Sequence, residues 1–409
     1  MRRHGRSSGP SSRLRVLVVT PSRQIWGAER SVLALAPLLE DLGIDLVLGS
    51  PPGGDLELAW LKLGLQRAPL ELPIHAGIRS DAGDVTNPGS RPGPGALVAE
   101  LMATVRTVHQ VARAARSANV VHSNSLWQHL DCALAGHVAR RPVVLELHDL
   151  VRPGMGRQLL SAASRLSSAT VAISKAVAGV VGDGSSTGVQ VVTQAVDLER
   201  FRPGPGDPAV RRLLTDDPEG LLVGIVGRVD PMKGVDVLVR AMALLGDQAA
   251  AARLVVVGSP GLDAGEYDHE VRAQAGRLLR ERVRFVGSMD EVPEVLRSLD
   301  VLVNASRSEP FGLSVLEAQA SGVPVVATRS GGIPDFVSDG DNGLLVSPDD
   351  PASLARALER LLLDADLRRR LGRRGRETAV ADHGLERRAG ALAEIYRAVA
   401  QREPVLCAR

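Results

Sequence analysis

Short runs of aliphatic and β-branched residues alternate with helical patterns along the 409-residue chain. Examples are LRVLVV at 14–19, VAIS at 171–174 and LLVGIVG at 221–227, each followed by a polar turn and a helical segment. Strands that alternate with helices pair in parallel, because the helix carries the chain back to the edge where the next strand starts. The chain is long enough for two such cores. We therefore expect an α/β protein of two doubly wound, Rossmann-like parallel-sheet domains that face each other across a cleft.

Proline and glycine cluster between residues 201 and 207, where we place the boundary between the domains. The predicted limits are a disordered basic tail at 1–13, a first domain at 14–203 and a second at 204–383, followed by residues 384–409. Within the first domain, hydrophobic residues repeat at helical spacing and predict one amphipathic helix: Leu97, Leu101, Val105, Val108, Val111 and Ala115.

Composition excludes several classes of function. There are 49 Lys and Arg residues against 47 Asp and Glu, a net charge of +2, and only 2% of residues are aromatic, so we expect no nucleic-acid partner. Cys132 and Cys407 lie too far apart for a metal or redox motif, which fits a reducing cytoplasm. The apolar run after the tail is too short for a signal peptide or a span. No Walker pattern and no Gly-x-Gly-x-x-Gly opens either half, which disfavours P-loop and dinucleotide-binding proteins.

Two carboxylates, Glu309 and Glu317, flank a turn and the start of a short helix between two predicted strands. Gly312 and Leu313 fall at the helix N-terminus, where amides without intrahelical acceptors favour phosphate or sugar oxygens. Two acids with such amides between them can hold a polyhydroxylated ring. The alternative is that Glu309 is a solvated loop acid and Glu317 a helix-surface residue.

The whole string SEPFGLSVLEAQASGVPVVAT resembles the Glu-x7-Glu signature of the retaining, GT-B-fold glycosyltransferases of the glycosyl transferase group 1 type. The resemblance implies that the first domain presents the acceptor, that the second holds a nucleotide-diphosphate sugar, and that the helix at 384–409 returns to the first domain. It implies that Glu317 faces the nucleotide ribose. The residues implied to hold donor-sugar hydroxyls are Glu309, Phe311, Gly312 and Leu313.

Two cations follow the strand at 221–227. Arg228 and Lys233 stand just before a helix, where charge-assisted hydrogen bonds to a diphosphate contribute about 1.5–3 kcal/mol each. Either residue alone is as well explained as a surface charge. Together they resemble the family's Gly-Arg…Lys-Gly pattern, which implies that they bind the diphosphate.

Further site residues rest on the same resemblance. His148, at the end of the strand VVLELHD, matches the histidine that approaches donor sugar and phosphate, although a single histidine is more often structural. Ser174 matches a small polar residue, Gly27 lies in the glycine-containing loop of the first domain, and Gly287 to Met289 supply backbone near the base. Two departures weaken the match: Trp26 replaces one of two loop glycines, and Gln194-Ala195 replaces Asn-Gly in the interdomain segment.

The implied activity is a metal-independent, retaining hexosyltransferase without a cofactor, acting on a glycan, glycolipid or small-molecule acceptor in envelope polysaccharide biosynthesis. Asp339-x-Asp341 and Asp364-x-Asp366 are interpreted as turn and cap residues rather than as metal ligands. Two rival hypotheses are a sugar-nucleotide epimerase of similar fold and a catalytically silent donor-binding or scaffolding subunit. We expect a cytoplasmic protein with peripheral contact at the inner face of the membrane.

Overall fold

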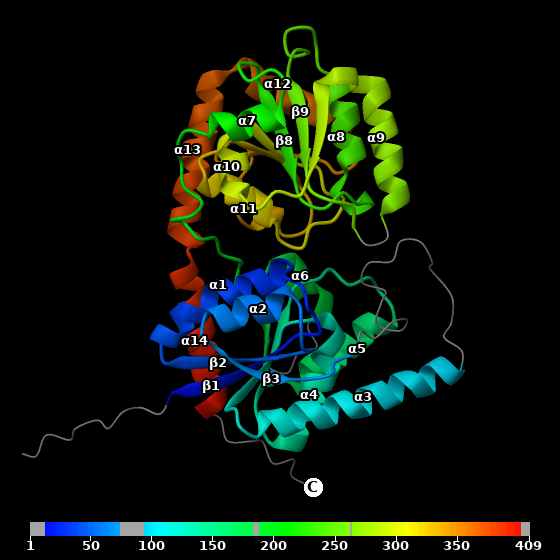
Figure 1. Ribbon diagram of the computed structural model, residues 1–409, viewed down its shortest axis with the longest axis vertical. Helices are drawn as coiled ribbons and strands as arrows, with labels where there is room; N and C mark the ends of the chain where they lie inside the picture. Colours follow the sequence, from blue (N-terminus) through cyan, green and yellow to red (C-terminus); the bar gives the residue numbers. More distant parts are fainter. Residues whose placement is uncertain (1–12, 74–93, 183–187, 262–263, 402–409) are drawn as a thin grey trace, which may run out of the picture. The chain divides into compact units, whose positions relative to one another are not determined.

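The computed structural model describes residues 13–73, 94–182, 188–261 and 264–401. The chain forms two compact units (Figure 1). The first unit comprises Met1–Ala172, Val180–Gln190 and Ala389–Arg409, and the second comprises Ile173–Gly179 and Val191–Arg388. All but Arg13 of the predicted basic tail lies outside the described residues. The boundary after residue 203 stays a prediction, and residues 191–203 group with the second unit.

The first unit is built on a seven-stranded sheet with the order β3-β2-β1-β4-β5-β6-β7. The order reverses direction at β1, which pairs in parallel with both β2 and β4, so the sheet is doubly wound as predicted. Its strands are β1 (Leu14–Val19), β2 (Ile44–Ser50), β3 (Gln66–Pro69), β4 (Val120–Ser123), β5 (Val143–Leu147), β6 (Ala169–Ala172) and β7 (Val189–Val191). Its helices are α1 (Gly27–Asp41), α2 (Asp55–Lys62), α3 (Pro94–Ala115), α4 (His129–Ala139), α5 (Met155–Leu166), α6 (Lys175–Val181) and α14 (Leu385–Gln401), with a short 3-10 turn at Leu126–Gln128; α6 and α14 each have residues in both units.

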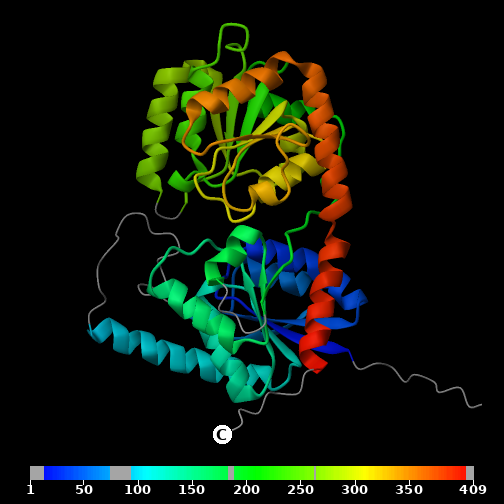
Figure 2. The same cartoon turned by 180° about the vertical axis from the view of Figure 1, so that it is seen from behind.

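The second unit holds a six-stranded sheet with the order β10-β9-β8-β11-β12-β13. Its strands are β8 (Leu222–Val226), β9 (Arg253–Val257), β10 (Val283–Gly287), β11 (Val301–Asn304), β12 (Val325–Thr328) and β13 (Leu344–Val346). Its helices are α7 (Pro208–Leu214), α8 (Val235–Ala243), α9 (Gly265–Leu279), α10 (Val292–Arg297), α11 (Leu313–Ala320), α12 (Pro351–Leu363) and α13 (Ala365–Asp382), with 3-10 turns at Pro231–Lys233, Arg280–Arg282 and Ile333–Asp335. Helix α8 packs against α9 and α12, whereas α11 packs against α10 and α13 (Figure 2).

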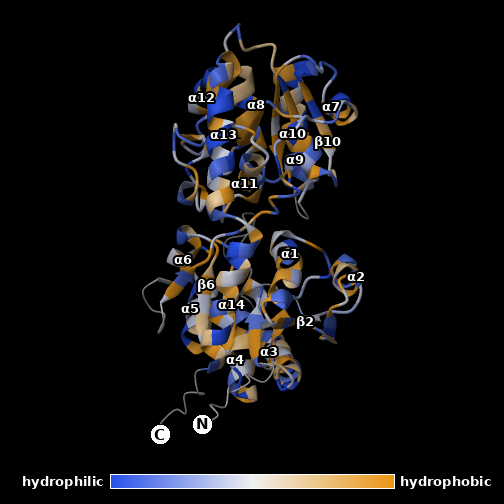
Figure 3. Cartoon of the chain, turned by 90° about the vertical axis from the view of Figure 1, so that its left-hand side faces the viewer, coloured by the Kyte–Doolittle hydropathy of each residue, from blue (hydrophilic) through white to orange (hydrophobic). Residues whose placement is uncertain are grey.

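The central strands of both sheets are buried, which explains why they read as continuous apolar runs. Val16 to Val19 of β1 are at most 1% exposed, and Val301 to Val303 of β11 likewise. Figure 3 shows this as hydrophobic colour concentrated on strands and inward helix faces, while α13 carries mostly hydrophilic residues. In α13 Leu371 is fully buried, and the surrounding arginines lie mainly on the outer face.

Two local expectations need correction. Gly27 was expected in a loop, but α1 begins at this residue; the buried Glu29 accepts a hydrogen bond from the Trp26 amide at 3.3 Å and caps the helix. The helix predicted around residues 97–115 is present as α3, but its hydrophobic stripe is not buried throughout. Val111 is buried, whereas Leu101 is 62% exposed and Val105 56% exposed.

Candidate active site

Glu309 lies in the turn between β11 and α11 of the second unit and is only 6% exposed. Its Oε2 accepts hydrogen bonds from Lys233 Nζ at 2.7 Å, Asn304 Nδ2 at 3.1 Å and Ser306 Oγ at 3.0 Å. Burial by itself raises the pKa of Glu309, but the charge of Lys233 and these hydrogen bonds outweigh it and hold the pKa below its ordinary value. The side chain is therefore a carboxylate at neutral pH, fixed in one orientation.

Lys233 reaches Glu309 because its own loop is held against the end of β11. Asp230 accepts from the Lys233 amide at 3.1 Å and caps the 3-10 turn at Pro231–Lys233. The next residue, Gly234, has φ of 65°, and a Cβ there would lie 2.1 Å from the Ala305 carbonyl oxygen. Only glycine permits this approach of the two backbones.

A second ion pair joins the same two loops. Arg307 donates to Asp236 from Nη1 at 2.9 Å and from Nη2 at 2.8 Å, and Tyr267 OH donates to the same carboxylate at 2.7 Å. Burial acts to raise the pKa of Asp236, but the Arg307 and Tyr267 contacts hold it below its usual value. This pair was not predicted. Asp236 lies three residues after Lys233 and Arg307 two residues before Glu309, but no pattern in the sequence indicates that the two side chains meet.

Gly312 is the N-cap residue of α11. Its φ is 108°, and a Cβ at this position would lie 2.3 Å from Ile333 Cδ1, so a larger residue is excluded. Phe311 is buried and stacks on Phe336 with ring centroids 4.8 Å apart, so its ring serves the packing of the unit. Leu313 opens the helix, and Glu317, 9% exposed, lies one turn further on.

Ser174 supports the Glu309 turn from the segment Ile173–Gly179. Its Oγ donates to the Pro310 carbonyl at 2.7 Å, and the Gly332 amide donates to the Glu309 carbonyl at 2.9 Å. A Cβ on Gly332 would lie 2.5 Å from that Pro310 oxygen. The structure thus shows Ser174 holding the backbone beside Glu309; its predicted contact with the donor stays a prediction.

Three more predicted residues follow strand ends along the same edge of the second sheet. Arg228 follows β8; its side chain is 59% exposed and Nη2 lies 3.3 Å from Asp230 Oδ2. Gly287 ends β10, and its carbonyl accepts from the Gly258 amide at 2.8 Å, while Met289 is half-buried just beyond. The carboxyl ends of parallel strands share one edge, so these residues line the edge that carries Lys233 and Glu309.

In the first unit, His148 follows β5 and its side chain is 10% exposed. Its Nε2 lies 3.1 Å from Asn124 Oδ1 and 3.7 Å from Glu146 Oε1. Gly27 is exposed in the first turn of α1, next to Trp26, which is 45% exposed. Burial raises the pKa of Glu29, which caps this turn.

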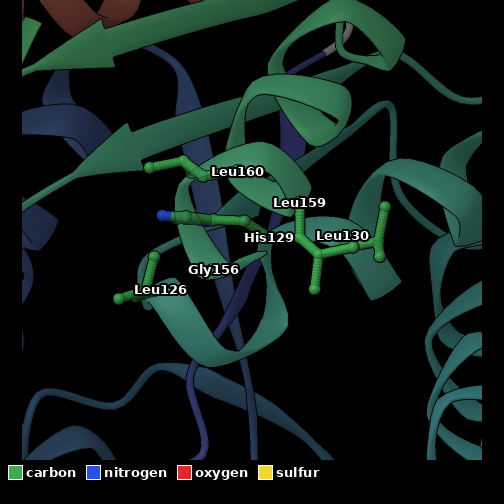
Figure 4. A pocket seen from close by; sticks show the side chains of 6 residues that line it. All are labelled: Leu126, His129, Leu130, Gly156, Leu159 and Leu160. Atoms are coloured by element: carbon green, nitrogen blue, oxygen red, sulfur yellow. The ribbon is translucent and has the colours of Figure 1, made fainter. Parts of the chain in front are cut away.

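A small pocket in the first unit contains none of the predicted site residues. Figure 4 shows its lining of leucine side chains around His129: Leu126, Leu130, Leu159 and Leu160, with Gly156. His129 Nδ1 lies 2.8 Å from Ser123 Oγ, so this imidazole is held by a neighbouring hydroxyl.

Of the Asp-x-Asp residues, Asp364 caps α13, as predicted, whereas Asp341 pairs with Arg374 at 3.2 Å and Asp339 accepts from the Leu345 amide at 2.9 Å. Within the described part of the chain, no group of three or more His, Cys, Asp or Glu side chains could hold a metal ion. No helix in that part is long and apolar enough to cross a bilayer.

Two doubly wound parallel-sheet units in one chain are the architecture of the GT-B fold. Among solved structures, the Anabaena protein HepE in complex with UDP and glucose is similar over 94% of this chain and 99% of that chain, with a TM-score of 0.78 and 22% identity. The fold expected from the sequence is confirmed.

Two family models match the chain. Residues 210–378 match the family described as glycosyl transferases group 1, and residues 25–200 match Glycosyltransferase Family 4. The chain thus carries one domain that matches each of these two glycosyltransferase family models. It is 39% identical over 219 residues to the D-inositol 3-phosphate glycosyltransferase of Streptomyces bingchenggensis, covering 51% of this chain and 47% of the relative. It is 41% identical over 228 residues to the D-inositol 3-phosphate glycosyltransferase of Salinispora arenicola, covering 52% of this chain and 50% of the relative. The chain thus matches about half the length of these curated relatives.

Proposed function

We propose that this protein transfers a hexose from a nucleotide-diphosphate sugar to a hydroxylated acceptor, with retention of anomeric configuration and without a metal. The observation that carries the proposal is the Lys233–Glu309 pair at the carboxyl edge of the second sheet, beside the N-terminus of α11. A cation, a fixed carboxylate and helix-start amides together suit a ligand that has both phosphate and sugar hydroxyls.

In this proposal Lys233 and Arg228 stabilise the departing diphosphate. The bond from the anomeric carbon to the phosphate oxygen breaks, so negative charge grows on that oxygen, and cations placed there bind the transition state more strongly than the substrate. The acceptor oxygen bonds to the anomeric carbon from the same face, and its proton passes to the departing phosphate oxygen. No protein nucleophile takes part.

Glu309 orients the sugar ring. Its Oε2 is occupied by Lys233, Asn304 and Ser306, which fix the carboxylate so that it accepts a hydroxyl hydrogen bond without first reorganising. Glu317 holds the ribose, and His148 of the first unit acts on the donor sugar and phosphate. The backbone at Phe311 to Leu313 binds sugar hydroxyls, and that near Gly287 and Met289 meets the base.

The acceptor class is a polyhydroxylated glycan, glycolipid or small molecule. The curated relatives named D-inositol 3-phosphate glycosyltransferases make a phosphorylated cyclitol the first acceptor to try. We assign the enzyme to envelope polysaccharide biosynthesis in the cytoplasm.

We further propose peripheral contact with the inner face of the membrane. Helix α3 exposes Val98, Leu101 and Met102, and Arg106 and Arg113 are exposed further along it. Flotation with phosphatidylglycerol vesicles tests this: the wild-type protein should float and a Leu101→Ser, Met102→Ser variant should not, whereas equal flotation of both would rule out α3 as the contact.

The experiment for the activity is a panel of UDP-, GDP- and ADP-hexoses with the full-length protein. One nucleotide class should stabilise the wild type, raising its free energy of unfolding by about 2.7 kcal/mol at a donor concentration of 100 times the dissociation constant. The wild type should also hydrolyse that donor slowly when no acceptor is present. Lys233→Ala and Glu309→Gln should lose turnover. Binding without turnover would favour the scaffolding hypothesis, an altered sugar recovered on its nucleotide would favour an epimerase, and no binding at all would refute the proposal.

A further inference from the structure

Four side chains of the first unit form a mostly buried chain from α14 to the end of β5. Tyr396 OH lies 2.9 Å from His122 Nδ1, and His122 Nε2 lies 3.1 Å from Glu146 Oε2. The other carboxylate oxygen, Oε1, lies 3.7 Å from His148 Nε2. Tyr396, His122 and Glu146 are at most 2% exposed. A carboxylate so deeply buried is costly unless charge or hydrogen bonds compensate it.

The placement follows from strand register. His122 of β4 pairs with Val144 of β5, and Glu146 is two residues further along, so both side chains lie on the same face of the sheet. Tyr396 reaches His122 from α14, because residues from Ala389 onward belong to the first unit. These four side chains therefore connect β4, β5 and α14.

The contacts of His148 indicate which of its ring nitrogens carries the proton. Nε2 lies within hydrogen-bond distance of Asn124 Oδ1, at 3.1 Å, and the charged Glu146 Oε1 lies further off at 3.7 Å, so Nε2 carries the proton. Nδ1 is then the ring nitrogen that accepts a hydrogen bond or takes a second proton. On the other side of the carboxylate, Tyr396 OH lies 2.9 Å from His122 Nδ1, and His122 Nε2 makes a close contact with Glu146 Oε2 that lacks hydrogen-bond geometry.

We propose that Glu146 is a positioning residue for glycosyl transfer: its buried carboxylate, packed against His122, acts together with Asn124 to hold His148 in its Nε2–H tautomer. This rests on the proposed function, in which His148 acts at the donor. In metal sites, a carboxylate beside the non-ligating nitrogen of a histidine orients the ring in the same way. Its removal there lowers metal affinity or activity by about 10–100-fold.

The first measurement does not depend on activity. Nitrogen-15 spectra of the histidine rings in the full-length protein should show His148 as the Nε2–H tautomer, and Glu146→Gln should convert it in part to Nδ1–H. Thr170→Val is the matched control, because its hydroxyl is buried on β6 and bonds to Ser164 at 2.8 Å, away from the chain of four. It should leave the His148 signals unchanged.

The second measurement is turnover of the donor found by the panel. Glu146→Gln should lower kcat about 10-fold with the donor KM changed less than about twofold, since it acts on the transition state through His148. Tyr396→Phe should lower kcat less, because the carboxylate remains. An unchanged tautomer in Glu146→Gln, or a raised KM at normal kcat, would overturn the proposal.

The two proposals fail separately. If wild type turns over no sugar nucleotide, the proposed function fails, and the histidine spectra still decide whether Glu146 sets the tautomer. If Glu146→Gln does not fold, Tyr396→Phe decides: lowered kcat with unchanged KM supports the role of the chain, and unchanged kcat refutes it.

Discussion

Replacing Lys233 by methionine tests how the charge of Glu309 is stabilised. The substitution keeps the aliphatic volume but leaves a carboxylate that is 6% exposed with only two neutral hydrogen bonds, from Asn304 and Ser306. Removing one partner of a buried ion pair costs about 3–5 kcal/mol. Because the Lys233 side chain is 24% exposed, we expect the lower end, about 3 kcal/mol at pH 7.

The pH dependence separates this cause from lost packing. In wild type the pKa of Glu309 is depressed, so its contribution to stability is present above the unfolded value near 4.3 and is lost as pH falls through the folded value. Without Lys233, burial dominates and raises the pKa of Glu309, so the variant loses stability as pH rises. The difference between the two proteins should therefore shrink between pH 7 and pH 5.

Thermal unfolding without ligand is the assay. A difference of 3 kcal/mol should lower the Tm of the transition of the second unit by about 6–12 °C at pH 7, and by less at pH 5. Lys175→Met is the control, since that side chain is exposed in the same unit, and it should shift Tm by less than about 2 °C. A Lys233→Met effect that is equal at both pH values would refute the electrostatic explanation.

Three further substitutions distinguish residues that hold the loops of the site in place from residues that are proposed to contact the donor. Asp236→Asn removes the charge that Arg307 binds, so we expect a loss of about 1.5–3 kcal/mol in chemical denaturation; an unchanged midpoint would show that the pair does not hold the loops. Gly234→Ala places a Cβ against the Ala305 carbonyl, so it should lower both stability and donor affinity, and a normal Kd by calorimetry would contradict the described geometry. Arg228→Ala should change the free energy of unfolding by less than about 0.5 kcal/mol yet lower kcat; normal turnover would remove Arg228 from the diphosphate site.

The strands were predictable from sequence because their signal is local: buried parallel strands appear as unbroken aliphatic runs. The structure places β8 beside β11, which brings together the loops that follow them. Lys233 and Glu309 were each singled out by their position after such a strand together with the family resemblance. Their direct contact at 2.7 Å is a structural finding.

The rest depends on pairings that no local pattern encodes. Asp236 occupies an ordinary position in the first turn of α8, and only the fold reveals that Arg307 binds it. Glu146 lies inside an aliphatic strand and looks like an isolated polar residue until β4 and α14 bring His122 and Tyr396 to it. The early start of α1 was missed because its cap is a side chain, Glu29, from within the helix.

The order in which the chain visits its two units has a consequence for dissecting the enzyme. It passes from the first to the second after Ala172, returns after Gly179, leaves again after Gln190 and returns once more after Arg388. The loop of Glu309 therefore receives its Ser174 contact from a stretch that is separated in sequence from the rest of its unit. Neither unit can be cut out as one continuous fragment, and a second unit expressed from residue 204 onward would lack the Ser174 contact that supports its Glu309 turn.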